Sequence, residues 1–259
     1  MKLGKGDIAV IMGASSGIGS AMARELSRRG AFVIISGRNK KALELLADEL
    51  GHDKAVVIPA DLGTTEGCKR LYSESLMYSP NILINNAGFG IYGLFSETDA
   101  DREAQLIDLD VRAVHILSKL YGDAFERQGG GYILNVGSLA GFMPGPLMSS
   151  YYAAKAYVIR HTQAVWLEKL FTGSKVRVSV LCPGPVQTPF NERAGIRGSI
   201  KGISPEQCAR EAVKGMELGL PMIFPSASAK AVAVGSFFAP ALISGAAAYF
   251  MQRASKKRV

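Results

Sequence analysis

Short apolar runs alternate with amphipathic segments along most of the chain. The apolar runs predict seven strands, at 7–13, 31–37, 54–62, 81–88, 131–138, 175–184 and 220–226. Helical spacing of apolar positions predicts helices at 17–30, 40–51, 65–78, 101–127, 149–171 and 205–218. Continuous apolar strands separated by helices are typical of a parallel sheet covered on both faces. We therefore expect one doubly wound α/β domain over residues 1–226, with a seven-stranded parallel sheet.

The pattern changes after residue 226. Residues 231–251 carry no charge, and a basic cluster follows, made of Arg253, Lys256, Lys257 and Arg258. Three structures fit this pattern: a helical cap or hairpin over a pocket or a partner subunit, a helix lying in a membrane interface, and a membrane-spanning helix. The Ala, Gly and Ser content and Pro240 in mid-run favour the cap. We expect residues 227–259 to form an apolar and basic helical extension.

Composition and charge exclude several classes of protein. The 259 residues are 48% hydrophobic and 20% charged, which is typical of a globular chain. The net charge of +8 forms no basic stripe interleaved with aromatic residues, so we expect no nucleic-acid partner, although it suits anionic phosphates or a membrane surface. The three cysteines, Cys68, Cys182 and Cys208, form no CxxC and predict neither disulfides nor a metal site. Without an apolar leader pattern, we expect a cytoplasmic protein, with a membrane's inner face as the alternative.

A glycine-rich turn follows the first predicted strand and opens the first predicted helix. Glycine permits a sharp turn and a close approach of backbone to a pyrophosphate, while the helix N-terminus offers free N–H groups. Such a turn alone can serve only to reverse the chain, but here its strand–turn–helix context is that of a Rossmann dinucleotide site. The candidate cofactor-binding residues of the turn are Gly13, Ser15, Ser16, Gly17, Ile18 and Gly19.

The end of the second predicted strand indicates which dinucleotide binds. NAD-binding proteins place an acid there to bind the ribose hydroxyls, but this chain has Gly37 followed by Arg38. A guanidinium at this position can bind a 2′-phosphate, with Ser16 and Asn39 close enough in sequence to help. The alternative is that Arg38 is a surface residue at a helix start. We favour NADP(H) as the cofactor.

A tyrosine and a lysine share one face of the helix predicted at 149–171. Tyr151 and Lys155 are four residues apart, whereas Tyr152 is turned away by about 100°. A neighbouring ammonium lowers the pKa of a phenol and brings it closer to useful acid–base range. Ser138 ends a strand ahead of this helix and can donate to a substrate carbonyl oxygen. Alone, this Tyr–Lys spacing also occurs by chance, and Tyr152 is expected to be a packing or pocket residue.

With these motifs, the chain resembles the short-chain dehydrogenase/reductase family over about residues 6–225. The motifs occur in order as Gly13-x-x-x-Gly17-x-Gly19, Asp61, Asn85-Asn86-Ala87-Gly88, Ser138, Tyr151-x-x-x-Lys155, and Pro183-Gly184 with Thr188. The resemblance implies hydride transfer between a nicotinamide and a carbonyl or alcohol, with Tyr151 as acid or base and Lys155 also contacting the nicotinamide ribose. The cofactor-binding residues that it adds are Asp61 and Leu62 near the adenine, then Asn86, Ala87, Gly88, Pro183, Gly184, Val186 and Thr188.

Two positions depart from the family pattern. Met12 replaces a usual threonine, which affects only a local hydrogen bond. Asp110 stands where the family usually carries a catalytic asparagine, which holds a water partly through its backbone carbonyl. An aspartate keeps that carbonyl and adds a charge near Lys155, which favours the protonated lysine. We therefore count Asp110 among the catalytic candidates, while a non-catalytic NADP(H)-binding sensor or scaffold remains the alternative function.

Three loops that set specificity in the family are rich in apolar side chains. They contribute Phe89, Tyr92, Phe142, Met143, Pro144, Leu147, Met148 and Phe190. We expect an apolar pocket for a lipophilic ketone, aldehyde or secondary alcohol, although several of these residues would serve equally to pack a lid or a subunit contact. The family also implies a homodimer or homotetramer through helices 101–127 and 149–171. His115 and His161 in these helices are expected at an interface or core edge, without a metal.

Overall fold

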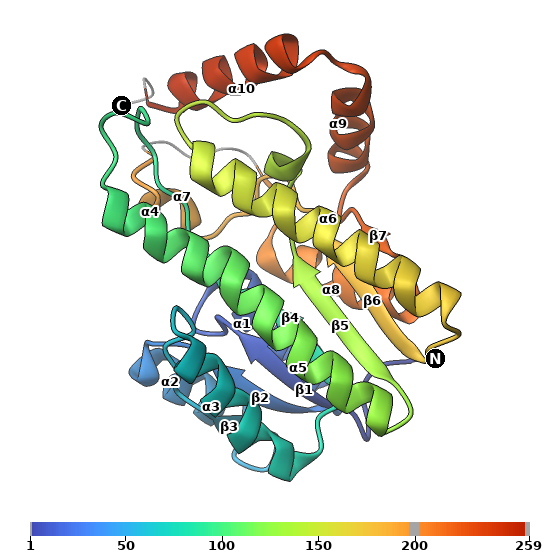
Figure 1. Ribbon diagram of the computed structural model, residues 1–259. Helices are drawn as coiled ribbons and strands as arrows, with labels where there is room; N and C mark the ends of the chain where they lie inside the picture. Colours follow the sequence, from blue (N-terminus) through green and yellow to red (C-terminus); the bar gives the residue numbers. More distant parts are fainter. Residues whose placement is uncertain (1, 197–201, 257–259) are drawn as a thin grey trace.

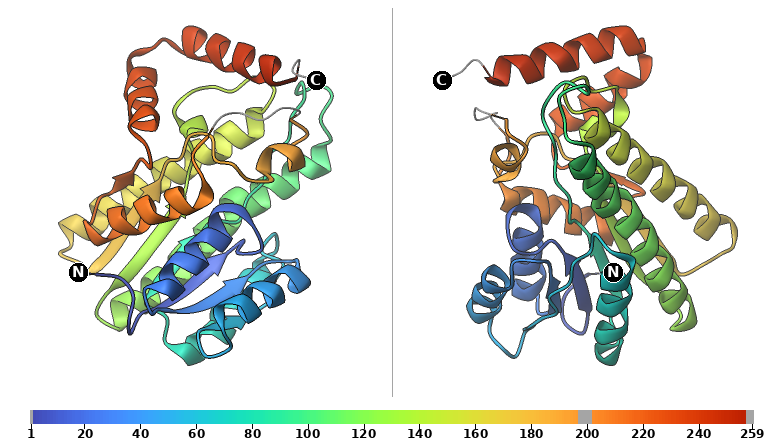
Figure 2. Two further views of the ribbon diagram at one scale, coloured as in Figure 1. Left: turned by 180° about the vertical axis from the view of Figure 1, so that it is seen from behind. Right: turned by 60° about the vertical axis from the view of Figure 1, so that its left-hand side comes forward.

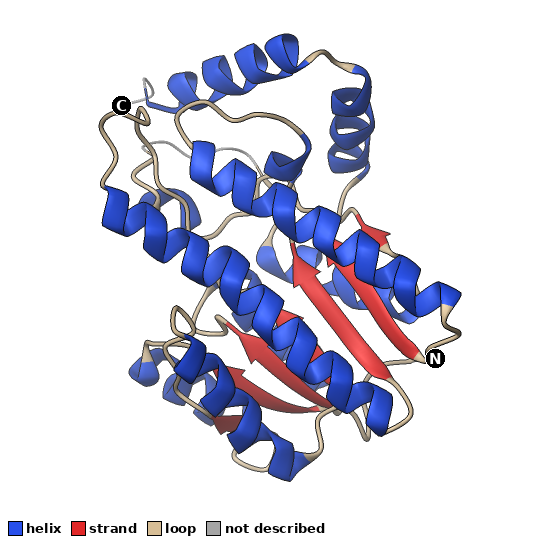
Figure 3. Cartoon of the chain, viewed as in Figure 1, coloured by secondary structure: helices blue, strands red, loops and turns tan. Residues whose placement is uncertain are grey.

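The computed structural model describes residues 2–196 and 202–256, and a parallel sheet of seven strands lies at its centre (Figure 1, Figure 3). The strands are Ile8–Met12 (β1), Phe32–Ser36 (β2), Ala55–Val57 (β3), Ile82–Asn85 (β4), Gly131–Val136 (β5), Val176–Leu181 (β6) and Met222–Ile223 (β7). Their order in the sheet is β3-β2-β1-β4-β5-β6-β7, and all pairs are parallel. The predicted fold class is confirmed.

Helices cover both faces of the sheet. They are Gly17–Arg28 (α1), Lys40–Leu50 (α2), Thr65–Ser75 (α3), Ala100–Ile107 (α4), Ala113–Arg127 (α5), Ser149–Phe171 (α6), Phe190–Arg193 (α7), Pro205–Glu217 (α8), Ala227–Phe238 (α9) and Ala241–Lys256 (α10). One apolar cluster packs α1, α2 and α8 against one face, and a second packs α3 and α5 against the other. The three cysteines are free and buried, as expected.

The strand order identifies the point on the sheet where a ligand is expected to bind. β1 pairs with β2 on one side, where Ile8 lies opposite Phe32, and with β4 on the other, where Ala9 lies opposite Ile82. The chain therefore builds the sheet outward from β1 in one direction and then from β4 in the other. Loops leaving the carboxyl ends of β1 and β4 diverge at this point, and doubly wound folds bind their ligands in the crevice so formed.

The long helix predicted at 101–127 is confirmed, and it runs without a break from residue 100 to residue 127. A π-helical turn, Asp108–Arg112, joins α4 to α5. In this turn, Asp110 faces inward and is fully buried. Its Oδ1 accepts a hydrogen bond from the backbone N–H of Phe89 at 3.0 Å, and its Oδ2 lies beside Lys155. Such π-turns frequently occur at functional sites.

The C-terminal extension forms two helices at one end of the molecule, far from α2 and α3 (Figure 2). The chain turns between them at Ala239 and Pro240, which divides the uncharged segment. On the inner face of α10, Ala248 is buried in the apolar cluster that also contains Tyr152. In the described residues, no helix is long and apolar enough to cross a membrane. The expected helical cap over the pocket is therefore observed, with two helices.

Candidate active site

A cavity of about 700 Å³ opens at the carboxyl ends of the strands. Most of the predicted site residues line it, namely Gly13, Ser15, Ser16, Gly17, Ile18, Arg38, Asn39, Leu62, Asn86, Ala87, Gly88, Ser138, Tyr151, Lys155, Pro183, Gly184, Val186 and Thr188. Gly19, Asp61 and Asp110 are not in its wall. Asp61 is exposed and accepts from the backbone N–H of Gly63, so its place near an adenine stays a prediction. One cavity thus joins the phosphate turn to the Tyr–Lys pair.

Two glycines of the turn have no room for a side chain. Gly13 has φ +66°, and a Cβ there would lie 2.8 Å from Ala87 Cα. A Cβ on Gly19 would lie 2.4 Å from the carbonyl oxygen of Gly13, so α1 packs tightly against the end of β1. Asn86 Nδ2 fixes this turn by donating to the carbonyl oxygens of Met12 and Gly13, at 3.1 and 3.2 Å. The bare backbone at the α1 N-terminus therefore fits a dinucleotide pyrophosphate.

The end of β2 presents a cation to the cavity. Arg38 is exposed and lines the cavity beside Asn39, whose Oδ1 accepts from the N–H of Ala42 and caps α2. A Cβ on Gly37 would meet nothing closer than Leu43 Cδ1 at 3.9 Å, so the absence of an acid at this position is not imposed by space. No aspartate or glutamate lines the cavity in the part of the chain that the structure describes. The cavity wall beside Arg38 therefore carries a positive charge and no described carboxylate, which suits an anion.

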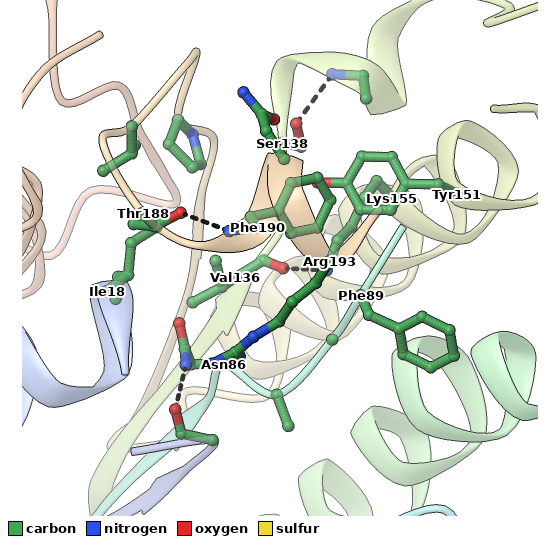
Figure 4. Close-up of a pocket in the computed structure, with 18 of the residues that line it drawn as sticks. Ile18, Asn86, Phe89, Val136, Ser138, Tyr151, Lys155, Thr188, Phe190 and Arg193 are labelled. Atoms are coloured by element: carbon green, nitrogen blue, oxygen red, sulfur yellow. Dashed lines mark hydrogen bonds between the residues drawn. The ribbon is translucent and has the colours of Figure 1, made fainter. Parts of the chain in front are cut away.

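Ser138, Tyr151 and Lys155 converge on this cavity from two elements (Figure 4). Ser138 follows β5; its Oγ accepts from the N–H of Ala140 at 3.1 Å, and its hydroxyl also hydrogen-bonds that of Tyr151. Tyr151 and Lys155 lie one helical turn apart on α6, with Lys155 Nζ 5.6 Å from the centre of the Tyr151 ring. The ring of Phe190 packs against Tyr151, with 5.0 Å between ring centres.

Lys155 is held by two oxygens in a buried position. Its Nζ donates to the carbonyl oxygen of Val136 at 3.1 Å and lies 3.1 Å from Asp110 Oδ2. Burial raises the pKa of the Asp110 carboxyl, but the ammonium and the Phe89 N–H oppose this by stabilising the carboxylate. Burial works against the charged lysine, yet the attraction of Asp110 keeps the pKa of Lys155 above its usual value. The expected proximity of Asp110 and Lys155 is confirmed.

The phenol of Tyr151 does not behave as the spacing alone predicts. Burial of the group raises its pKa above the usual value, and this effect outweighs the opposing effects of the Lys155 charge and the Ser138 hydroxyl. The expectation of a net lowering by Lys155 is therefore wrong. A raised pKa keeps Tyr151 protonated at neutral pH, which is the form that can donate a proton.

A match to a family model over most of the chain shows which family the protein belongs to. The family model described as short chain dehydrogenase matches residues 7–197. The chain belongs to the short-chain dehydrogenase family. By this membership, it is an oxidoreductase. An uncharacterized oxidoreductase of Staphylococcus aureus (strain MRSA252) is 32% identical over 183 residues, which cover 70% of this chain and 78% of that protein.

Solved structures of short-chain dehydrogenases share the fold. A short-chain dehydrogenase from Sphingobium yanoikuyae in complex with NADPH superposes with a TM-score of 0.81 at 29% identity, covering 88% of this chain and 92% of that one. The bulky-bulky ketone specific alcohol dehydrogenase from Comamonas testosteroni has a TM-score of 0.76 at 29% identity, covering 85% and 86%. A member from Burkholderia phymatum in complex with NAD has a TM-score of 0.83 at 22% identity and supports the fold alone.

The substrate side of this short-chain dehydrogenase is only partly as predicted. Phe89, Met143, Met148 and Phe190 line the cavity, whereas Tyr92, Phe142, Pro144 and Leu147 do not. Phe142 instead packs against Phe224, with ring centres 6.1 Å apart. Tyr92 touches the apolar cluster around Tyr152, and Pro144 faces Gly245 of α10. These residues support the wall of the cavity rather than form it. Residues 197–201 of the third specificity loop lie outside the described residues.

Several lining residues were not singled out from the sequence. They are Asn191, Arg193 and Ile196 in or just after α7, and Val232, Met251 and Gln252 in the extension. Gln252 is buried, and its Nε2 donates to the hydroxyl oxygen of Tyr152 at 3.1 Å. Tyr152, beside the Tyr–Lys pair, thus ties α10 to α6. The uncharged composition of the extension favoured a cap, but no periodic signal identified which residues reach the cavity.

Proposed function

We propose that this protein is an NADP(H)-dependent oxidoreductase that reduces a ketone or aldehyde of a lipophilic substrate, or oxidises the corresponding alcohol. The observation that carries the proposal is the convergence of Ser138, Tyr151 and Lys155 on the cavity that also contains the glycine turn and Arg38. A chance Tyr–Lys spacing on a helix would not bring these groups together. The same convergence favours an enzyme over a sensor or scaffold.

The residues present fit the dinucleotide that the family uses. The turn from Gly13 to Gly19 would hold the pyrophosphate at the α1 N-terminus, and Asn86, Ala87, Gly88, Pro183, Gly184, Val186 and Thr188 would hold the nicotinamide half. Arg38, with Ser16 and Asn39, would bind the 2′-phosphate, because a guanidinium pairs well with phosphate oxygens. The NADPH complex of the Sphingobium relative supports this preference. When bound, NADP(H) supplies or accepts the hydride at the carbonyl carbon.

Side chains of the protein donate the proton and stabilise the charges that its transfer creates. Tyr151 donates its phenolic proton to the carbonyl oxygen during reduction, and Ser138 donates a second hydrogen bond to the same oxygen. Lys155 stabilises the phenolate that Tyr151 becomes, because its positive charge lies beside the ring. Asp110 keeps Lys155 protonated through their ion pair. Burial of this pair also excludes water, so the charge of Lys155 is screened less at the phenol than it would be in water, although Asp110 partly offsets it.

The apolar wall supports a lipophilic substrate. Met143, Met148, Phe190 and Ile196 line the cavity next to Tyr151, and Val232 and Met251 close it from the extension. Burying substrate carbons against these side chains stabilises the complex by about 25 cal/mol for each Å² removed from water. The bulky-ketone specificity of the Comamonas relative is consistent with such a pocket.

The decisive experiment follows oxidation of NADPH, with NADH alongside, across ketones graded by chain length and ring number. We expect consumption of NADPH over NADH, with kcat/KM rising as the ketone becomes more hydrophobic. Binding of NADPH, measured by calorimetry, without turnover of any carbonyl compound would instead support the sensor function. Activity that falls with hydrophobicity would contradict the apolar pocket.

The outer face of the extension favours a second, compatible role at a membrane surface. Leu242 is 84% exposed, Ile243 62% and Phe250 67%, so α10 turns large apolar side chains away from the protein. Beyond Glu217, the sequence has five basic residues and no acid. Apolar faces bordered by basic residues are typical of helices that lie in the interface of an anionic bilayer. We propose that the cytoplasmic protein binds a membrane peripherally through this face.

Assembly into a homodimer or homotetramer through α5 and α6 stays a prediction. On this side, His115 Nδ1 lies 2.8 Å from the hydroxyl oxygen of Tyr157, whose ring stacks on His161 with centres 5.5 Å apart. Among the described residues, no group of side chains forms a metal site. These aromatic side chains are suited to a subunit contact.

A further inference from the structure

The short helix α7 is fixed against the proposed catalytic tyrosine. The ring of Phe190, at its start, packs on Tyr151. Just after its end, Ala194 is buried in the same apolar cluster, and its carbonyl oxygen accepts from the backbone N–H of Tyr92 at 3.0 Å. The helix therefore has two anchors, one on each side of its last residue, Arg193. The position of Arg193 relative to Tyr151 follows from these anchors.

Arg193 places a positive charge in the cavity. It is three residues after Phe190, so both side chains lie on the same face of the helix. The side chain of Arg193 points into the cavity, and the cavity wall includes it (Figure 4). Within the described residues, it makes no salt bridge and no side-chain hydrogen bond. Arg193 is therefore a cation without a protein counterion.

The other cations of the cavity differ from Arg193 in this respect. Lys155 is balanced by Asp110 at 3.1 Å. Arg38 stands at the end of β2, where the 2′-phosphate is proposed to bind. The pyrophosphate is proposed to bind at the α1 N-terminus, whose free N–H groups stabilise an anion. No carboxylate of the described wall is available to Arg193. Arg193 is exposed, so water solvates its charge in the free protein, and an anionic ligand bound in the cavity would pair with it.

We propose that Arg193 binds a carboxylate of the substrate, so that the substrate is an amphipathic oxo acid rather than a neutral ketone. A guanidinium matches a carboxylate in planar, two-bond geometry, and one guanidinium balances one negative charge. The apolar wall binds the hydrocarbon part, while Tyr151 and Ser138 bind the ketone. This inference rests on the proposed function, which fixes the ketone at Tyr151. It narrows the substrate class to molecules with an acid group within reach of α7.

The test measures equilibrium binding to the protein loaded with NADP⁺, in which a ketone cannot be reduced. The probes are 4-, 5- and 6-oxodecanoic acid and their methyl esters, titrated calorimetrically. In the wild type, we expect at least one acid to bind about tenfold or more tightly than its ester. Arg193→Gln should bring this ratio to about one, and Arg193→Lys should keep part of it. Arg210→Gln removes the same charge from an exposed position outside the cavity and should leave the ratio unchanged.

Two results would overturn the inference. One is a wild type that binds every acid no more tightly than its ester. The other is an Arg193→Gln variant that loses NADP⁺ affinity by the same factor as it loses acid affinity, because Arg193 would then serve the cofactor. The proposed function is tested separately by NADPH oxidation with the methyl esters and neutral ketones. If no ketone is reduced, the ratio of acid to ester affinity can still be measured by calorimetry. Failure of the proposed function is therefore distinguishable from failure of this inference.

Discussion

Lys155 Nζ lies 3.1 Å from Asp110 Oδ2, and both side chains are buried, Lys155 at 5% exposure and Asp110 at 0%. The ion pair links the π-turn between α4 and α5 to the face of α6 that carries Tyr151. A Cβ on Gly88 would lie 2.6 Å from the same carboxylate oxygen, so the end of β4 closes over the pair. Asp110 therefore acts on the proposed reaction through Lys155, as a positioning residue.

Asp110→Asn should move the alkaline limb of the pH profile of kcat/KM to lower pH. The charge of Asp110 raises the pKa of Lys155, while burial lowers it. Removing that charge leaves burial opposed only by Tyr151, so Lys155 loses its proton at lower pH and its support of the Tyr151 phenolate is lost earlier. The measurement is kcat/KM for NADPH-dependent ketone reduction across the neutral and alkaline range.

Asp108→Asn provides the matched control for this prediction. Asp108 lies in the same π-turn, but its partly exposed carboxylate pairs with Arg112 at 3.0 Å rather than with Lys155. The Asp108 variant should keep the wild-type profile. An Asp110→Asn profile that also coincides with the wild type would show that Asp110 does not control Lys155.

Tyr151→Phe should lower kcat by roughly 10²–10⁴-fold, the usual contribution of a general acid. The dissociation constant of NADPH should change little, because the ring and its packing against Phe190 remain. Tyr152→Phe is the control on the adjacent residue, since it removes only the hydroxyl that meets Gln252. Stopped-flow oxidation of NADPH and calorimetric NADPH binding separate the two effects. Comparable losses of kcat in both variants would contradict the assignment of Tyr151.

Much of the fold could be predicted from the sequence because its elements have strong local signals. The strands are continuous apolar runs, and the glycine turn has one dominant steric explanation. The π-turn at Asp108–Arg112 has no signal in the spacing of apolar positions, and the contact of Asp110 with Lys155 joins residues 45 positions apart. The direction of the Tyr151 pKa likewise depends on burial, which spacing along a helix does not report.

The substrate side was harder to predict for a related physical reason. α7 has only four residues, so it shows no periodicity, and Arg193 faces the cavity because Phe190 and Ala194 anchor its helix. The composition of the extension was compatible with a cap, an interfacial helix or a span. Packing of Ala248 into the cluster around Tyr152 selects the cap, and it leaves the outer face of α10 exposed.

Gly37→Asp combined with Arg38→Leu should reverse the cofactor preference from NADPH toward NADH. A side chain at residue 37 has room, since the nearest atoms to its Cβ are 3.9 Å or more away. The new carboxylate would accept from the ribose hydroxyls and repel a 2′-phosphate, while loss of Arg38 removes the proposed phosphate partner. We expect the ratio of kcat/KM for NADPH to that for NADH to fall by about tenfold or more. Unchanged ratios would show that Arg38 does not bind the 2′-phosphate.

Ile243→Gln combined with Phe250→Gln should weaken binding to anionic vesicles while leaving the fold intact. Each of these side chains contributes about 1.5–3 kcal/mol when it moves from water into an apolar phase, and neither is buried in the protein. Leu45→Gln is the matched control, because Leu45 is 62% exposed, the same as Ile243, but lies on α2 at the other end of the molecule. Co-sedimentation with phosphatidylglycerol–phosphatidylcholine vesicles, at low and high salt, measures the effect.

We expect the wild type and the Leu45 variant to bind, more weakly at high salt, because screening reduces the attraction between the basic residues and the lipid. Wild-type protein that stays in the supernatant with every vesicle would rule out the membrane role. If the wild type instead forms a larger oligomer than the double variant, the outer face of α10 is a subunit contact.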